Sequence, residues 1–535
     1  MSRPVLKPYQ QNQMMLLPPT WEELIEPNDP VRLVNSVVDR LDLDQLLKKY
    51  NTKGAPSYHP RLLLKVLVYA YMNNIYSSRR IEEACRTHLH MIWMCGGQRP
   101  DHNTINRFRT DRFGKVLKEV FSQVVHLLVE QGLTSLEEIY VDGTKMESVA
   151  GRYTFVWRKN IERNTQRIAE QLEELWNYAE GVARHELAAH RPENFEAVDP
   201  AAVQRTIEKI DQALKGKEVD KRVKKKVDKA KRNWPGKVKE YQERKEQMAG
   251  RNSLSKTDPD ATFMRMKEDH MGSSQLKPAY NLQISTHDQF VVNFTLHQSP
   301  ADNTTLSDHL KNFQRLHKRL PTSLVADAAY GSEQNYHELC TAGVKAYVKF
   351  SHFDKVVKGK QPLSHVKAKG MRWDKNNESY ECPSGEHMPF TGVRRRTSEN
   401  GYDLVYAQYQ APLDCASCPL ASACPVAKAG VVEISHRLEH YREEAYERLT
   451  SEEGIRHRKR RGHDVETVFG SIKHNHYFRR CTMRGSSAVS IETGLMLIAH
   501  NLRKWARKKL LRTFFGNPRQ LTQPWLQPRF AYSWH

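Results

Sequence analysis

The chain has 535 residues, with 84 lysines and arginines against 62 aspartates and glutamates, which gives a formal net charge of +22. This length allows two to four domains with a sizeable core, and the longest apolar runs fall well short of the roughly 18–20 residues of a membrane span. The first residues carry no basic head followed by an apolar stretch, so we expect no secretory signal and a cytoplasmic protein. The excess charge favours a polyanionic partner, nucleic acid before an acidic membrane surface.

Two segments hold 20 of the 22 excess positive charges. Residues 205–250 contain 16 basic against 8 acidic side chains, and residues 456–512 contain 15 against 3. The first segment has two interpretations, a solvated helical hairpin with Glu/Lys pairs or a surface for a polyanion. The second has apolar residues throughout, which predicts a basic face held rigid against a core, as contacts with a phosphate backbone require.

Residues 1–132 are predicted to form a helical domain. Apolar residues recur at three- and four-residue steps from Pro60, and further helices are expected to begin at Ser77 and near Pro100. Three arginines lie along the last of these helices: Arg107, Arg109 and Arg112. The pattern is consistent with a helix-turn-helix-like DNA-binding unit or with a plain helical bundle.

Residues 133–515 are predicted to form an α/β domain with a mixed sheet flanked by helices. Helices are expected at 303–320 and 333–339, and the predicted strands are Glu138–Asp142, Ala279–Ser285, Phe290–Leu296, Ser323–Asp327 and Val344–Phe350. Two segments interrupt this pattern, a basic helical one at about 153–256 and a cysteine-containing one at 351–450. Residues 516–535 are left as a tail.

Two of the predicted strands end in an aspartate with a glycine close behind. Asp142 follows Ile139–Val141, and Asp327 follows Leu324–Ala326. A third acid, Glu466, lies on a predicted helix. A single aspartate at such a position is commonly a turn former or helix cap, but three carboxylates converging from two strands and a helix would suit Mg²⁺ or Mn²⁺. Two such ions can support phosphodiester cleavage.

The stretches around these acids resemble the three acidic motifs of bacterial insertion-sequence DDE transposases. The resemblance rests on Tyr140–Lys145, Val325–Ser332 and Val465–Lys473, and on the N-terminal stretches Tyr58–Leu64, Ser77–Ile81 and Pro100–Ile105. It implies an RNase H-like core in which Asp142, Asp327 and Glu466 are catalytic and hold two Mg²⁺ or Mn²⁺ ions. It also implies double-stranded DNA as partner, both terminal inverted repeats and target, and a homodimer or higher oligomer on DNA, associated with the nucleoid.

The resemblance extends to side chains near the acids. Tyr280, Asn281 and Gln283 match a motif on the second strand, and Ala499–Leu502 resembles the closing helix. We expect DNA contacts from Lys473, Lys145, Arg461, Arg479 and Arg480, with a plain surface role equally open for Lys145.

The chain departs from the family pattern at two positions. Relatives carry an arginine four residues before the third acid, where this chain has Gly462 with Arg461 beside it. Ala329 replaces a more usual glycine, and its small side chain is expected to be tolerated.

Four of the eight cysteines cluster in the second interrupting segment: Cys382, Cys415, Cys418 and Cys424. The Cys-x2-Cys pair is typical of one knuckle of a structural Zn²⁺ site, although the spacing to Cys424 is wider than usual. Unpaired or redox-labile thiols are the alternative.

The function predicted from the sequence is a transposase that binds element ends and cleaves and rejoins DNA. Two other classes stay open. One is a catalytically inactive, transposase-derived DNA-binding protein, and the other is an RNase H-like nuclease without strand joining.

Overall fold

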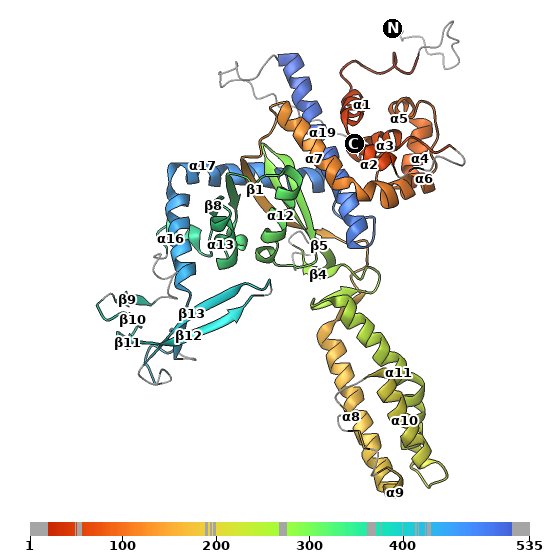
Figure 1. Cartoon of the computed structure of the whole chain (residues 1–535), viewed down its shortest axis with the longest axis vertical. Helices are drawn as coiled ribbons and strands as arrows, with labels where there is room; N and C mark the ends of the chain where they lie inside the picture. Colours follow the sequence, from red (N-terminus) through yellow and green to blue (C-terminus); the bar gives the residue numbers. More distant parts are fainter. Residues whose placement is uncertain are drawn as a thin grey trace, which may run out of the picture. The chain divides into compact units, whose positions relative to one another are not determined.

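A computed structural model describes residues 20–515, apart from 49, 51–55, 188–190, 193–194, 196–198, 267–274, 361–370, 375, 399, 412–414, 416, 423 and 425–429 (Figure 1). The described chain divides into two compact units. The first contains the residues up to Thr134, Ser471–Tyr477 and those from Thr493 onward; the second contains Ser135–Gly470 and Phe478–Glu492. The predicted tail lies outside the described residues.

The first unit is helical, as expected. Its helices begin at residues that favour helix starts: Asp29 accepts a hydrogen bond from the backbone N–H of Val31, and Asp101 accepts from those of Asn103 and Thr104. Proline stands at the first position of α1 and α3. The helices are α1 (Pro30–Arg40), α2 (Asp44–Leu47), α3 (Pro60–Met72), α4 (Ser78–Thr87), α5 (Leu89–Met94), α6 (His102–Arg107), α7 (Leu117–Glu130) and part of α19 (Ser486–Phe515).

One of the three arginines after Pro100 is part of the core of this unit. Arg109 is 5% exposed, and its guanidinium donates to the hydroxyl of Tyr71, the carbonyl of Tyr76 and the side chain of Asn106. Arg107 is exposed. The buried position of Arg109 therefore gives it a structural role and removes it from any DNA-facing row.

The second unit is built on a six-stranded mixed sheet. Its strands are β1 (Glu138–Glu147), β4 (Thr262–Arg265), β5 (Leu276–His287), β6 (Phe290–His297), β7 (Ser323–Ala326) and β8 (Lys345–Val348), in the order β4-β5-β1-β7-β8 with β6 also paired to β5. The pairs β1–β5 and β5–β6 are antiparallel, whereas β1–β7 and β7–β8 are parallel. The five predicted strands are confirmed as parts of this sheet, which β4 extends.

Helices cover the sheet and connect its parallel strands. Contacts place α12 (Leu306–His317) against β6, α13 (Glu333–Thr341) and α16 (His436–Thr450) against β8, and α17 (Glu452–Arg461) against β7. Beyond α17 the helical path continues through a π-helical turn (Gly462–Glu466), α18 (Thr467–Gly470) and a second π-helical turn (Ser471–Asn475). The mixed α/β class is confirmed; the RNase H-like assignment and the domain boundaries remain predictions.

Between β1 and β4 the chain forms a helical block with its own core. Helices α8 (Arg158–Val182), α10 (Pro200–Leu214) and α11 (Lys221–Met248) pack against one another, with α9 (Arg184–Leu187) after α8 (Figure 1). Fifteen buried residues form one cluster here, among them Trp176, Ile210 and Trp234. The pair β2 (Phe155–Trp157) and β3 (Ser253–Ser255) joins the two ends of the block.

The cysteine-containing segment holds strands that the sequence did not predict. One small sheet consists of β9 (Arg372–Asp374), β10 (Ser379–Glu381) and β11 (His387–Met388), and another of β12 (Phe390–Thr397), β13 (Asp403–Gln410) and β14 (Val431–Ile434). A short helix, α14 (Phe353–Val357), precedes them. No helix in the described part of the chain is both long and apolar enough to cross a membrane.

One buried histidine of the first unit makes its stability depend on pH. His476 is 1% exposed, and its Nδ1 lies 3.1 Å from the side-chain oxygen of Asn74. Burial, together with the positive charge of Arg503, His500 and Arg507, lowers the pKa of His476 to about 3. The folded chain therefore keeps this imidazole neutral where an unfolded chain would protonate it.

We predict that stability falls as the pH drops below about 6.5, the pKa of an unfolded histidine, towards 3. Between these pH values the unfolded chain binds a proton at His476 that the folded chain does not bind. Each pH unit therefore lowers the free energy of unfolding by up to about 1.4 kcal/mol. The His476→Gln variant should lose about 1–2 kcal/mol less than the parent between pH 7 and pH 5, in urea unfolding. The exposed His88, changed to Gln, is the control; equal slopes for H476Q and the parent would contradict the prediction.

Candidate active site

The helix α17 contacts the central strand β1 through two polar pairs, one helical turn apart on α17 and two residues apart on β1. The hydroxyl of Tyr140 is 3.0 Å from Nδ1 of His457, and Nη1 of Arg461 is 3.1 Å from Oδ2 of Asp142. Two residues along a strand advance about 6.7 Å and four along a helix about 6 Å, so the two contacts repeat at matching steps. Asp142, at the end of the apolar stretch, thus faces the helix and is 16% exposed.

Arg461 also reaches the third predicted acid. Its Nη2 lies 3.5 Å from Oε1 of Glu466, so one guanidinium contacts the carboxylates of Asp142 and Glu466. The π-helical turn Gly462–Glu466 explains this geometry, since i→i+5 hydrogen bonds bring residues five apart onto one face. Arg461, next to the departure at Gly462, thus lies within reach of Glu466, and its role as substitute for the family's arginine stays a prediction.

Asp327 lies at the same edge of the sheet as Asp142. The parallel register pairs Tyr140 with Val325, and each acid stands two residues beyond this pair. Oδ1 of Asp327 also accepts a hydrogen bond from the backbone N–H of Ala329 at 2.9 Å, capping the short 3₁₀ turn Ala328–Tyr330. Asp327 therefore both follows the end of β7 and caps the 3₁₀ turn.

The pKa of the buried Tyr330 hydroxyl is affected by the negative charge at this edge of the sheet. Burial, followed by the negative charges of Asp142, Asp302 and Asp327, raises its pKa well above the usual value, and Arg461 opposes this shift. The phenol hydroxyl donates a hydrogen bond to Oε1 of Gln283. Tyr330 therefore remains a neutral donor beside an acidic edge.

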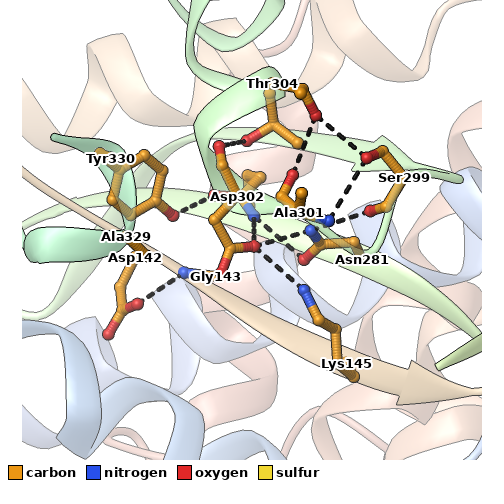
Figure 2. A network of polar contacts seen from close by, with 12 residues as sticks. Asp142, Gly143, Lys145, Asn281, Ser299, Ala301, Asp302, Thr304, Ala329 and Tyr330 are labelled. Atoms are coloured by element: carbon orange, nitrogen blue, oxygen red, sulfur yellow. Dashed lines mark hydrogen bonds and ion pairs between the residues drawn. The ribbon is translucent and has the colours of Figure 1, made fainter. Parts of the chain in front are cut away.

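A further acid, Asp302, holds a polar network beside Asp142 (Figure 2). Its Oδ1 accepts from Nζ of Lys145 at 3.0 Å, Nδ2 of Asn281 at 2.7 Å and Nε2 of Gln283 at 2.9 Å. Asn281 and Gln283 are fully buried. Asp302 was not predicted as a site residue from the sequence, although it directly precedes the helix predicted at 303–320.

The remaining predicted DNA contacts have different surroundings. Lys145 pairs with Asp302, and Lys473 is 9% exposed in the second π-helical turn. Arg479 and Arg480 are both exposed, and the guanidinium of Arg480 donates to the carbonyls of Ser148, Val149 and Ala150. The predicted DNA contacts of all these residues remain predictions.

The predicted metal ligands are not arranged as a closed coordination sphere. In the part of the chain that the structure describes, no group of three or more His, Cys, Asp or Glu side chains is placed to hold a metal ion. Cys382, Cys415, Cys418 and Cys424 do line one cavity of about 490 Å³, together with Met371 and Met388. None of these four cysteines forms a disulfide, and zinc binding stays a prediction.

Comparison with known families gives two matches. Residues 19–111 match the model described as Transposase domain (DUF772), and residues 381–506 match the model described as Transposase DDE domain. The acidic edge that contacts α17 through Asp142 is thus found in a chain with matches to transposase domains. The two matches confirm the resemblance to insertion-sequence DDE transposases.

The second match contains Arg461, Glu466 and Lys473, while Asp142 and Asp327 lie before it. The assignment of the first two acids therefore depends on the sequence motifs and on the sheet geometry. No curated protein matches the chain.

We predict that Gly143→Ala disrupts the Asp302 network. A Cβ at this position would lie 2.3 Å from Nε2 of Gln283 and 3.0 Å from Oδ1 of Asp302, so the network must shift. The overpacking should lower the free energy of unfolding by about 1–3 kcal/mol in urea titrations. Gly236→Ala is the control, because a Cβ in that exposed helical position meets nothing within 4 Å and should stabilise slightly. Comparable loss in both variants would contradict the prediction.

We also predict that Arg461→Ala destabilises the metal-free protein. The substitution leaves the carboxylates of Asp142 and Glu466 without their shared cation. Because Glu466 is 65% exposed and solvent screens it, the loss should be modest, about 1–2 kcal/mol at low salt. The neighbouring exposed Lys459, changed to Ala, should shift stability by less than about 0.5 kcal/mol. An R461A variant as stable as K459A would contradict the proposed charge balance.

Proposed function

We propose that the protein is a transposase that binds insertion-sequence ends and catalyses DNA cleavage and strand transfer by two-metal phosphoryl transfer. The observation that carries the proposal is the contact of Arg461 with both Asp142 and Glu466, acids 324 positions apart in the chain. Asp327 ends the neighbouring parallel strand, and the matches to transposase domains supply the reaction class.

The residues fit divalent metal ions in the chemistry of their donors. Asp142, Asp327 and Glu466 offer hard carboxylate oxygens, and a guanidinium between two of them marks concentrated negative charge. When bound, two Mg²⁺ or Mn²⁺ ions would activate the attacking water or 3′-hydroxyl and stabilise the leaving oxygen. Pairing within β1 holds Asp142 in place and the end of β7 holds Asp327, while the more exposed Glu466 has freedom to turn towards the same centre.

The chain's own residues supply the preorganisation that such a reaction requires. The Asp302 network holds β1 and β5 in register next to Asp142, and Tyr330 holds Gln283 within it. Arg461 balances the two carboxylates and, with divalent ions bound there, would offer its positive charge to a DNA phosphate.

The sheet supports an RNase H-like catalytic core. Three antiparallel strands, β6, β5 and β1, continue into the parallel strands β7 and β8, and β1 is central. On this proposal, the helical block and the cysteine-containing segment are insertions into one core. The partner is double-stranded DNA in the cytoplasm, and bringing two ends together requires at least a dimer.

Two alternatives remain testable by product analysis. A catalytically inactive relative would bind DNA and leave it intact in the presence of Mg²⁺. An RNase H-like nuclease would cut an end-containing duplex and yield hydrolysed ends without joined product. Joined strands on a target duplex would exclude both.

We predict that Asp142→Ala, Asp327→Ala and Glu466→Ala each reduce cleavage of an end-containing duplex at least about 10²-fold, with duplex affinity changed less than about threefold. The carboxylates serve the metal ions, whereas affinity comes from backbone contacts. Gel assays of nicking with Mg²⁺ and fluorescence anisotropy with EDTA measure the two quantities. Asp308→Ala, a 69% exposed acid on α12, is the matched control.

The outcome for each acid is informative by itself. Near-parental cleavage by any one variant would remove that acid from the triad. Cleavage by the parent that persists at the same rate in EDTA would overturn the metal mechanism, whatever the variants do.

A further inference from the structure

The helix α11 carries a concentration of positive charge that the candidate active site does not use. Its residues 221–239 include ten lysines and arginines and a single acid, Asp228. The following turns, residues 240–247, hold three glutamates against two basic residues. The charge is therefore confined to the first two-thirds of one long helix.

The helical packing turns a row of these side chains to solvent. Val227, Ala230, Trp234 and Val238 are buried in the core of the helical block. The opposite side of the helix presents exposed side chains spaced four, four and three residues apart, which we call the basic ridge: Lys221, Lys225, Lys229 and Arg232. Such spacing places all four on one side of the helix.

Ion pairing distinguishes the ridge from two other lysines of α11, Lys226 and Lys231. Lys226 contacts Glu174 at 2.7 Å, and Lys231 contacts Asp211 at 2.6 Å, so lysines at the flanks of α11 pair with α8 and α10. Within the described residues, no ridge side chain has an acidic partner; Arg232 donates from Nε to the backbone carbonyl of Asp228. The interpretation of residues 205–250 as a solvated hairpin with Glu/Lys pairs therefore applies to the flanks of α11 but not to the ridge.

The ridge opposes the stability of its own helix. Like charges four residues apart repel, and Lys221 and Arg222 add positive charge at the positive end of the helix dipole, where the N-cap Asp220 supplies one carboxylate. An external polyanion would relieve both effects. The arrangement therefore favours a binding role over a solubilising one.

The surroundings of the ridge select the kind of polyanion. A helix that binds a membrane surface keeps its apolar face free to enter the lipid, but the apolar face of α11 is buried in the block. None of its large hydrophobic side chains is exposed. Along the helix the ridge spans about 17 Å, roughly the rise of five base pairs.

We infer that the basic ridge binds the phosphate backbone of double-stranded nucleic acid without regard to base sequence, as a second contact surface separate from the acidic edge. The inference depends on the proposed function only for the identity of the natural duplex. It requires neither the triad nor metal ions.

The test compares two quadruple variants of the full chain with equal loss of charge. The ridge variant carries Lys221→Gln, Lys225→Gln, Lys229→Gln and Arg232→Gln. The control variant neutralises four ion-paired side chains in or beside the same block: Lys217→Gln, Lys226→Gln, Lys231→Gln and Arg244→Gln. Binding to a random-sequence 30-base-pair duplex is measured by anisotropy in EDTA at several salt concentrations.

The ridge variant should weaken binding about 10²-fold at physiological salt and reduce the slope of log K against log salt by about 3–4, since each phosphate contact contributes about 0.9. The control should change the slope by less than about 1. Equal effects in the two variants, or loss of binding to phosphatidylserine vesicles with duplex binding intact, would overturn the inference. Because the ridge side chains are solvent-exposed, their replacement should leave the helical block folded. Circular dichroism and limited proteolysis check this.

The assay also separates this inference from the proposed function. Because it uses no metal and no element ends, it remains valid if the protein proves unable to cleave DNA. Conversely, a ridge variant that binds like the parent leaves the triad experiment untouched and removes only the second surface.

Discussion

The packing of α17 on β1 is the constraint on which the site depends. Tyr140 and Asp142 point to the same side of the strand, and His457 and Arg461 lie one helical turn apart, so the two elements meet in a single register. A shift of one residue along β1 would turn Asp142 to the other face of the sheet. The buried, neutral contact at Tyr140 thereby positions the charged contact at Asp142.

The π-helical turn after Arg461 carries this register on to Glu466. In a regular α-helix the side chains of residues 461 and 466 would diverge, because five residues exceed one turn by about 140°. The wider turn brings Glu466 within reach of the guanidinium of Arg461, which also contacts the carboxylate of Asp142. Helical irregularities of this kind are common at functional sites, where they redirect one side chain at a cost in backbone geometry.

Positive charge in this chain has two different uses. Near the sheet, Arg461, Lys145 and Arg480 are engaged by carboxylates or carbonyls and hold the structure together. On α11 the ridge lysines stand in solvent beside lysines that are paired. Net charge alone cannot distinguish the two uses, because the distinction lies in which carboxylates the folded chain brings within reach.

Much of this arrangement was readable from the sequence. Short apolar stretches rich in β-branched residues predicted the strands before Asp142 and Asp327. The predicted end at Asp327 is confirmed, but the one at Asp142 is wrong, because antiparallel pairing with β5 carries β1 on to Glu147. The helical N-terminal unit and the alternation of strands and helices followed from periodicity in the same way. The small strands of the segment from Arg372 to Ile434 were not predicted, since they are short and interrupted by polar turns.

What the sequence determined by itself is the set of local elements and the residue types at their ends, since these follow from short-range periodicity and backbone preference. The tertiary structure decided the partners. It paired Arg461 with Asp142, buried Arg109, gathered Lys145, Asn281 and Gln283 around Asp302, and left the α11 ridge unpaired. These outcomes depend on strand register, on one π-helical turn and on helix packing, which join residues from about twenty to more than three hundred positions apart and leave no trace in the local pattern.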